Sequence, residues 1–519
     1  MANPSPTTPP PPMSGATLVI ASMALALATF MNVLDISIAN VSIPALSGDL
    51  GVSFSQGTWV ITSFAVANAI AVPLTGFLTQ RFGAVRLFVT SVVLFVVASF
   101  LCGMSSSLGM LVFFRVMQGA VAGPMIPLSQ SLLLSSYPKA KAGVALTIWA
   151  MTTLVAPVMG PILGGWITDN ISWPWIFYIN IPFGLLSAAV TWALYRNRET
   201  PTHKVPIDYV GLGLLIVWVG SLQILLDKGN ELDWFNSAQI IALAITSAVA
   251  FCFFLVWELT DKHPVVDLSL FKGRNFWSGT LALSVGYGVF FGNVVLLPLW
   301  LQHDMGYTAT LAGSVLAPVG LLALLLSPMV GKYLSRSDPR LFATVAFMVF
   351  GLIFWMRSQF TPQADFVTIM IPSLIQGIAM ATFFVPLMTL IFSGLAHNRI
   401  AAASGLSNFV RIMAGGFGAS IFTSAWINRT STHHAVLAEH INFASLATQS
   451  TISGLDNTGM TSRQTLGFIN NLINQQASTM AVDDLAWLSA VLFIVMIGLI
   501  WLIHPIKSDE KSEAAAGGH

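Results

Sequence analysis

Charged residues are scarce in this chain of 519 residues: 8% are Asp, Glu, Lys or Arg, whereas 55% are apolar. A soluble domain carries about a quarter charged residues. The composition therefore excludes an ordinary soluble protein and indicates an integral membrane protein. The net charge is +1 and the basic residues form no stripe, which argues against a nucleic-acid partner.

Cysteine and the motifs of catalysis are also nearly absent. Cys102 and Cys252 lie in separate apolar segments and offer no disulfide framework. The sequence has no GxxxxGK[ST] run and no nucleophile–base set, and His433, His434 and His440 lack a metal-ligand pattern. We therefore expect no enzymatic activity, no metal and no cofactor, and the missing GxxxxGK[ST] run argues against ATP as an energy source.

Both ends of the chain are polar. The N-terminal run 1–12 is rich in proline and has neither a basic n-region nor a cleavage site, so we expect the first helix to be retained. Residues 1–16 and 505–519 are predicted to be disordered cytoplasmic tails.

Long apolar runs dominate the remainder. Runs of about twenty apolar residues separated by polar or Pro/Gly breaks predict transmembrane helices. The predicted fold class is therefore all-α integral membrane. The fourteen predicted helices are 17–42, 56–79, 86–104, 108–134, 143–168, 173–195, 208–227, 238–258, 276–301, 309–333, 341–357, 366–394, 400–427 and 485–504.

The distribution of basic residues predicts the orientation. With both termini in the cytoplasm, sixteen of the 22 Lys and Arg residues lie on that side. The outer loops then hold Lys228, Arg357, Arg429 and Arg463. This excess agrees with the positive-inside rule.

The outer segment 428–484 is unusually long. Helical spacing over 464–473 predicts an amphipathic helix outside the membrane. Loops of this length usually have a task, so both a docking or gating element and a mobile decoration remain open.

The sequence repeats itself. Gly76 to Arg81 matches Gly331 to Arg336 at an offset of 255, and Gln118-Gly119 matches Gln376-Gly377 at an offset of 258. These matches predict two related six-helix halves, 17–200 and 276–504, with two helices and a linker inserted at 201–275. Such repeats around a midplane site are a transporter architecture.

Four motifs give the chain a resemblance to a known family. Leu34 to Pro44 resembles the first-helix motif of the fourteen-helix drug:proton antiporter branch of the major facilitator superfamily. Gly76 to Arg86 is similar to that superfamily's loop between helices 2 and 3, and Arg115 to Gly119 resembles its helix 4 motif. Ala156 to Gly165 resembles the helix 5 motif that marks exporters.

The resemblance is strongest to the inner-membrane component of a tripartite multidrug efflux pump. It implies the following residues of a conformational motif: Gly76, Arg81, Gly83, Pro157, Gly160, Pro161, Gly164 and Gly165. In helix 5, the prolines remove backbone donors and the glycines allow close helix contact. One departure is Gln80, which stands where the family usually has Asp.

Asp35 is the acidic residue that no choice of helix boundaries places at a membrane surface or in an aqueous loop. An acid inside the membrane indicates a functional site. Counted from the outer helix ends, Asp35 and Arg115 both lie roughly 10–13 Å deep at 1.5 Å per residue. A proton-coupling pair is therefore predicted, and the family fold sets both residues against the central cavity. The alternative is a fixed ion pair that only holds helices together.

Other polar residues lie within the predicted spans, either in the substrate cavity or in ordinary interhelical bonds. The cavity candidates are Asn32, Asn40, Gln118, Gln130, Tyr178, Asn293, Gln376, Asn408 and Arg411. Arg411 either attracts electronegative substrates or bonds carbonyl groups near Gly415 and Gly416.

We therefore predict a proton-coupled multidrug exporter of hydrophobic or amphipathic toxic compounds, working by alternating access in a Gram-negative inner membrane. The resemblance also implies a periplasmic membrane-fusion adaptor and an outer-membrane channel as partners. One alternative is a proton-coupled carrier for a specific metabolite, siderophore or lipid. Another is a membrane receptor or scaffold that transports nothing.

Overall fold

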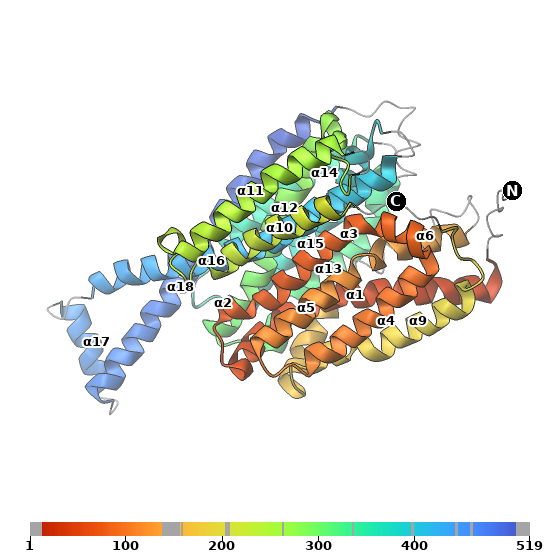
Figure 1. The fold of residues 1–519 in the computed structure, drawn as a ribbon. Helices are drawn as coiled ribbons and strands as arrows, with labels where there is room; N and C mark the ends of the chain where they lie inside the picture. The colour runs from red at the N-terminus through yellow and green to blue at the C-terminus, as the bar shows by residue number, and fades with distance from the viewer. Residues whose placement is uncertain are drawn as a thin grey trace, which may run out of the picture.

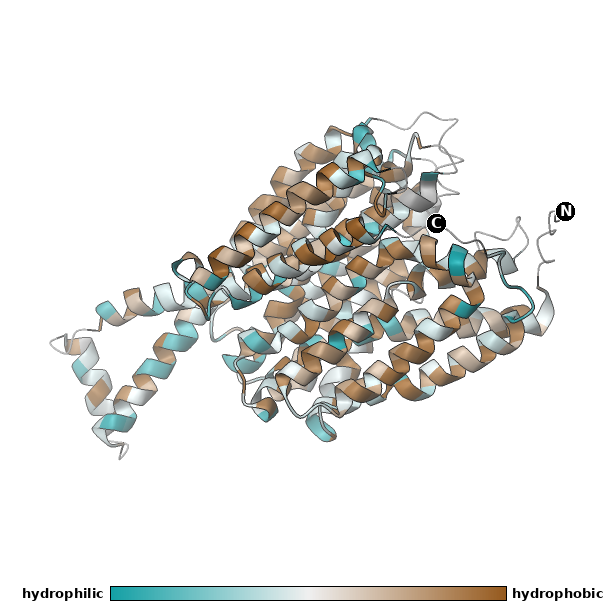
Figure 2. Ribbon diagram, viewed as in Figure 1, coloured by the Kyte–Doolittle hydropathy of each residue, from teal (hydrophilic) through white to brown (hydrophobic). Residues whose placement is uncertain are grey.

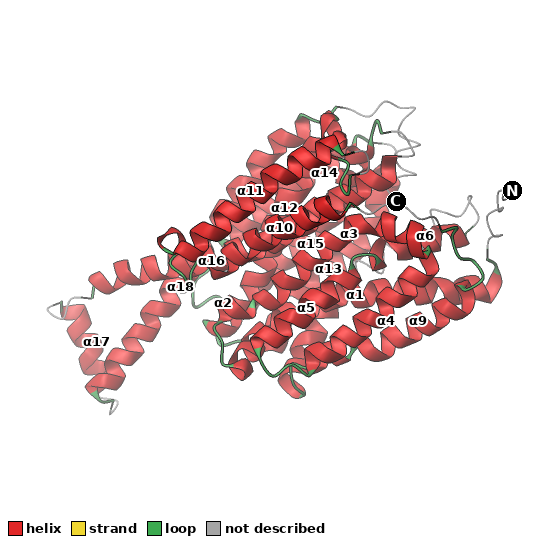
Figure 3. Ribbon diagram, in the orientation of Figure 1, coloured by secondary structure: helices red, strands yellow, loops and turns green. Residues whose placement is uncertain are grey.

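The computed structural model describes residues 13–137, 156, 159–202, 208–261, 264–334, 337–395, 399–441, 445–456 and 460–504. Within these ranges the chain is helical and has no strands (Figure 3). Thirteen helical segments of the described chain are long and apolar enough to cross a membrane. The remaining expected span, 143–168, falls largely outside the described residues, although 159–170 is helical. The all-helical membrane fold is confirmed.

The N-terminal half contains most of the first six spans. Its helices are α1 (Gly15–Leu50), α2 (Phe54–Gly57), α3 (Trp59–Phe82), α4 (Ala84–Gly103), α5 (Leu108–Ala122), α6 (Met125–Ser136), α8 (Trp175–Tyr178) and α9 (Asn180–Tyr195). The predicted span 108–134 is broken into α5 and α6 at Gly123 and Pro124, because proline has no N–H to donate to the preceding turn. Helix α1 ends at Gly51, whose φ of 65° favours glycine.

Two helices separate the halves. The inserted elements are α10 (Tyr209–Lys228), η2 (Trp234–Asn236), α11 (Ala238–Thr260) and η3 (Leu268–Lys272). The C-terminal half consists of α12 (Arg274–His303), α13 (Ala309–Leu334), α14 (Pro339–Arg357), α15 (Phe366–Phe392), α16 (Ile400–Glu439), α17 (Leu446–Asp456) and α18 (Ser462–Trp501). In Figure 1, α10 and α11 lie side by side, and α10 packs against both α16 and α3.

The described residues of 428–476 form a projecting arm rather than a separate loop, whereas the residues from Ala477 onward are largely buried in the bundle. Helix α16 continues to Glu439 and α18 begins at Ser462, so each is 40 residues long. The spacing over 464–473 is helical, as predicted, but it belongs to a helix continuous with the last span. Polar residues are more frequent in the arm than on the apolar bundle (Figure 2). The arm end of the bundle lies opposite the terminal end, where α1 begins and α18 ends (Figure 1).

The two halves contact each other at the arm end. The backbone N–H groups of Ala309 and Thr310 donate to the Asp169 carboxylate at 3.2 and 2.7 Å, which caps the start of α13. The Gln302 amide donates to the carbonyl of Val41 at 2.9 Å, which joins α12 to α1. Among the described residues, the direct hydrogen bonds that we find between the halves lie at this end.

Candidate functional site

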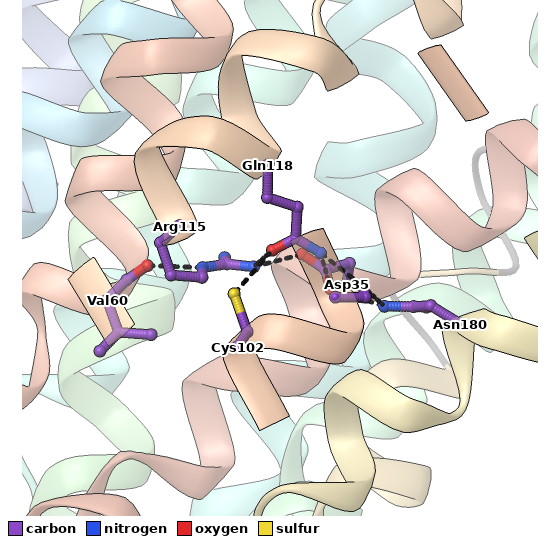
Figure 4. Close-up of polar contacts among 7 residues, drawn as sticks. Asp35, Val60, Cys102, Arg115, Gln118 and Asn180 are labelled. Carbon is purple, nitrogen blue, oxygen red and sulfur yellow. Dashed lines mark hydrogen bonds and ion pairs between the residues drawn. The ribbon is translucent and has the colours of Figure 1, made fainter. Parts of the chain in front are cut away.

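Asp35 and Arg115 form a buried ion pair. Asp35 lies on α1 and Arg115 on α5, and the guanidinium Nη1 donates to the carboxylate Oδ2 at 2.5 Å (Figure 4). Both side chains are 0% exposed. The equal depths predicted from the sequence therefore correspond to direct contact.

Neutral donors complete the coordination of the acid. The Asn180 amide at the start of α9 donates to Asp35 Oδ1 at 2.8 Å, and the Gln118 amide donates to the same oxygen at 3.2 Å. Both amides also contact Ser99 Oγ of α4, at 3.1 and 2.6 Å. The carboxylate thus accepts from three side chains.

Arg115 is held on several sides. Its Nε donates to the carbonyl of Val60 at 2.9 Å, and Nη1 also reaches Gln118 Oε1 at 2.6 Å. The guanidinium carbon lies 4.3 Å from the ring centre of Phe64 and 5.5 Å from that of Phe177. Cation–π contacts of this kind stabilise a desolvated Arg by about 2 kcal/mol.

The position of the pair differs from the expectation. The resemblance implied a pair facing the central cavity, but all of these partners belong to the N-terminal half, and Asp35 and Arg115 have no exposed surface. The pair is enclosed among α1, α3, α4, α5 and α9. Because all three donors are strengthened by the negative charge of Asp35, a proton that binds there weakens their hold on it.

Asn180 and Ser99 are contacts of the pair that were not predicted from the sequence. Asn180 was detectable as an amide inside a predicted span. Ser99 gave no such signal, because serine is common in membrane helices and its bonds to Gln118 and Asn180 depend on tertiary contact.

The C-terminal half contains a rearranged copy of this cluster. The offset of 258 relates Ser99 to Arg357, Arg115 to Ser373, Gln118 to Gln376 and Asp35 to Asn293. Arg357 Nη2 donates to Gln376 Oε1 at 2.8 Å and to Ser373 Oγ at 3.2 Å. Arginine and serine have therefore exchanged positions between the halves, and the acid is replaced by an amide.

Arg357 requires a correction. It ends α14, as the predicted span 341–357 has it, but the residue is 3% exposed and does not belong to an outer loop. The hydrogen bonds to Gln376 and Ser373 stabilise it inside the half, which hydropathy at a helix end does not reveal.

The remaining amide candidates are dispersed. Asn293 donates to Ser489 of α18 at 3.2 Å, and Asn32 donates to the carbonyl of Ala122 at 3.3 Å. Asn40 is buried and Gln130 is half-buried. We find no hydrogen bond from these four to Asp35.

Tyr178 does not join the other candidates. Its ring packs against Trp175, at 5.7 Å between ring centres, and Phe100, at 6.0 Å. Both neighbours are about half exposed, at 50% and 46%. This is the setting of an aromatic belt at a membrane interface, and it separates Tyr178 from the other cavity candidates.

Arg411 is a further cation within the predicted spans, and aromatic rings surround its guanidinium group. Its guanidinium carbon lies 4.6 Å from the ring centre of Tyr287 and 5.6 Å from that of Phe384. Its Nη2 donates to Asn408 Oδ1 at 3.1 Å. The side chain is half-buried, and we find no carboxylate paired with it in the described part of the chain.

The loop between α3 and α4 uses a different carboxylate from the family's. Gln80 cannot supply one, and the acid found at this loop is Glu199, which accepts from the backbone N–H groups of Val85 and Arg86, each at 2.9 Å. Gly83 has φ 89°, and a Cβ there would lie 2.3 Å from Glu199 Oε1. Glycine is therefore required on both counts.

The other two residues predicted for this loop are exposed. Gly76 has open space around it and Arg81 lies at the end of α3.

The glycines of the motif 156–165 lie in the helical segment 159–170, which is not α5, and they are close-contact positions. A Cβ on Gly160 would lie 2.5 Å from Ser37 Cβ, and one on Gly164 would lie 2.6 Å from the carbonyl oxygen of Ile38. Both contacts are with α1. Pro157 lies outside the described residues.

The same helix packs across the seam between the halves. A Cβ on Gly165 would lie 2.4 Å from the Ala309 carbonyl oxygen of α13, and one on Gly313 would lie 2.1 Å from the Pro161 carbonyl oxygen. The segment 159–170 therefore packs tightly against α1 within its half and against α13 of the other half.

We expect Gly313→Ala to open the arm end. The added methyl group overlaps the Pro161 carbonyl, and overpacking costs about 1–3 kcal/mol, which lowers the ratio of closed to open states by about tenfold or more. Spin labels at two exposed arm-end positions, Asp49→Cys and Asn428→Cys with Cys252 replaced by Ser, report this as a shift to longer distances. Gly331→Ala on the same helix is the matched control, because its Cβ meets open space. Equal distance distributions for the two variants would contradict the prediction.

Comparison with known proteins gives relatives over nearly the whole chain. The family model described as Major Facilitator Superfamily matches residues 25–419. Multidrug export protein EmrB of Escherichia coli (strain K12) is 52% identical over 495 residues, which cover 95% of this chain and 97% of that protein. Fatty acid resistance protein FarB of Neisseria gonorrhoeae is 48% identical, covering 98% of this chain and 99% of that protein.

Two solved structures share the fold. A peptide transporter POT in complex with sulfate has a TM-score of 0.62 at 12% identity and covers 93% of this chain and 95% of its own. A bacterial homolog of the human lysosomal transporter Spinster, in an inward-facing and unoccupied conformation, has a TM-score of 0.60 at 14% identity. That match covers 97% of this chain and 99% of its own.

Proposed function

The chain belongs to the major facilitator superfamily, and from this premise we propose that it exports hydrophobic or amphipathic toxic compounds in exchange for protons. The observation that carries the proposal is the ion pair between Asp35 and Arg115, an enclosed acid–base contact in a transporter fold. Asp35 takes and releases the proton, and Arg115 is its counter-charge.

Coupling follows from the contacts of Asp35. When the proton neutralises the carboxylate, Arg115 loses its counter-charge and keeps only its neutral acceptors, the Val60 carbonyl and Gln118 Oε1, so its side chain is free to shift. Because the partners come from five helices of one half, that movement changes how the half packs. A rocking motion of the two halves then exposes the drug site to one side at a time.

The terminal end of the bundle faces the cytoplasm in this proposal, and the arm faces the periplasm. The excess of Lys and Arg on the terminal side supports this orientation. The chain is a multi-pass membrane protein, and we assign it to the inner membrane of a Gram-negative cell by its likeness to EmrB of Escherichia coli.

We assign the drug site to the region around Arg411. The rings of Tyr287, Phe291 and Phe384 provide apolar faces, and Arg411 supplies a cation without a fixed anionic partner. An apolar surface with one charge suits amphipathic compounds. The likeness to FarB, which is named for fatty acid resistance, supports the same class.

Drug-driven proton flux tests the proposal. The purified chain in liposomes releases protons when an amphipathic drug is added, and unrelated drugs compete for one saturable site. A single tight substrate would instead favour a specific metabolite, siderophore or lipid carrier. An absence of counterflow would favour a receptor or scaffold.

We assign the arm as the docking site for a periplasmic membrane-fusion adaptor, which in turn recruits an outer-membrane channel. The arm is helical, projects from the bundle and exposes apolar side chains such as Leu446 and Phe468 among polar ones. Its three helices line a groove that includes Leu437, Thr448 and Leu472. The base of this groove contains Pro362 and Gln363 of the C-terminal half.

Shortening the arm is expected to abolish adaptor capture and efflux across both membranes while leaving flux in liposomes intact. Replacing 440–461 by a short Gly/Ser turn removes α17 and keeps the continuous helix α18, so the last span is undisturbed. Pull-down with the adaptor and drug-accumulation assays measure the two outcomes. Retained capture and efflux would rule out docking at the tip of the arm.

A further inference from the structure

Besides Asp35, the membrane bundle contains the carboxylate of Asp227, which contacts both halves. It lies in the last turn of α10, where Thr62 Oγ1 of α3 donates to Oδ2 at 2.9 Å. Ser420 Oγ of α16 donates to Oδ1, as does the Gln223 amide at 2.7 Å. One acid therefore links the N-terminal half, the C-terminal half and an inserted helix.

Further bonds attach the end of α10 to the same two helices. The Trp59 indole N–H donates to the Asp227 carbonyl at 3.3 Å, and Ser424 Oγ donates to the Leu226 carbonyl at 3.4 Å. A Cβ on Gly416 would lie 3.6 Å from Ala65 Cβ, so α3 and α16 are in contact beside the acid. We call this junction of α3, α10 and α16 the arm-end seam.

The donors at the seam are neutral, and charged groups are sparse around it. Lys228 follows Asp227 and places its ammonium 5.6 Å from the ring centre of Trp59. On α16, Arg411 and Arg429 lie nine residues to either side of Ser420. Elsewhere, the charged residue of α3 is Arg81 and that of α11 is Glu258, both near the terminal end, and the connection from α10 to α11 carries Glu231 and Asp233.

We propose that Asp227 is a proton-operated positioning residue that keeps the arm-end seam closed when ionised and opens it when protonated from the periplasmic side. The inference rests on the proposed function for its direction, since the arm end must open to release drug. It also assigns the inserted helix α10 a role as a strap across the two halves.

The physical basis is the balance of donors and acceptors. An ionised carboxylate only accepts, so it satisfies Thr62, Ser420 and Gln223 at once. A neutral carboxyl group accepts more weakly, and Ser420 has the Gly416 carbonyl as another acceptor at 3.3 Å, so the bonds to the acid lose their charge assistance. The α3–Asp227–α16 bridge is then weakened where the periplasm supplies the proton.

The test measures opening of the seam directly. The labels at Asp49→Cys and Asn428→Cys, in lipid nanodiscs, report the arm-end distance between about pH 5.5 and about pH 7.5, a range that spans ordinary protonation switches. With Asp227 present, acid increases the long-distance population by at least about fivefold, the lower end of usual coupling. In Asp227→Asn the long-distance population is high at both pH values and does not respond to acid.

Two further variants keep the test decisive. Glu231→Gln removes an exposed carboxylate from the neighbouring connection and is expected to behave like the unsubstituted chain. Ser420→Ala leaves the acid in place and removes one donor, so the seam opens partly at neutral pH and still responds to acid. This variant stands in if Asp227→Asn does not fold.

The outcomes also separate this inference from the export proposal. An Asp227→Asn protein that keeps the closed distance, or the same response to acid, overturns the role of Asp227. Drug-driven proton flux with an unchanged dependence on outer pH in that variant overturns it as well, while leaving export intact. If the unsubstituted chain shows no drug-driven proton flux but its arm-end distance still responds to acid, the export proposal is wrong and the role of Asp227 stands.

Discussion

Asp35→Asn is expected to reduce drug-driven proton movement by at least about 100-fold, because loss of a proton-transferring group typically costs 10²–10⁴-fold. The amide is similar in size to the carboxylate and cannot take up a proton near neutral pH. The NH2 group of the new amide also points at N–H donors of Arg115, Gln118 and Asn180. A donor cannot accept a hydrogen bond from another donor, so at least one of these bonds is lost. Proton flux in liposomes measures the loss.

The controls distinguish coupling from folding. Asp35→Glu keeps an ionisable group and is expected to retain measurable exchange. Asn293→Ala changes the repeat-related position in the C-terminal half, which bonds Ser489 and has no contact with the acid, and is expected to exchange protons. Near-normal exchange by a membrane-inserted Asp35→Asn protein would refute the assignment.

Arg115→Leu is expected to destabilise the protein by about 3–5 kcal/mol at neutral pH, the usual cost of removing one partner from a buried ion pair. The loss should decrease as the pH falls, because a protonated Asp35 no longer requires a counter-charge. The free energy of unfolding in detergent, measured across pH, checks both the size and the sign.

A double mutant isolates the interaction. Asp35→Asn combined with Arg115→Leu leaves no charge uncompensated, so it should be more stable at neutral pH than Arg115→Leu alone. Arg411→Leu is the matched control, because that cation is half-buried and has no carboxylate paired with it in the described chain. Additive effects of the two substitutions at the pair would show that the contact contributes nothing to stability.

Several features of the fold follow from short-range sequence properties. Thirteen of the fourteen predicted spans correspond to helical segments that meet the length and hydropathy of a crossing, because hydropathy over about twenty residues reflects the thickness of the bilayer. The ends of the helices were predicted less accurately. The arm was expected as an outer segment starting after residue 427, yet α16 continues twelve residues further, since polar helices outside the membrane have no hydropathy signal.

The site divides in the same way. Asp35 and Arg115 could be matched from the sequence because both are charges at one depth, and helix rise converts residue number into depth. Rotation about the helix axis and the choice of neighbours are not contained in such a count. For this reason the complete burial of the pair, the contact with Asn180 and the burial of Arg357 were not predicted.

By itself, the sequence determined the all-helical membrane class, the repeated halves and the acid that requires an explanation. These depend on hydropathy, charge and spacing along one chain. Only the tertiary structure brought Asn180 and Ser99 to Asp35, and Thr62 and Ser420 to Asp227, across separations of up to 193 residues. In a membrane, polar groups must find partners inside the protein, and the packing of distant helices decides which partners those are.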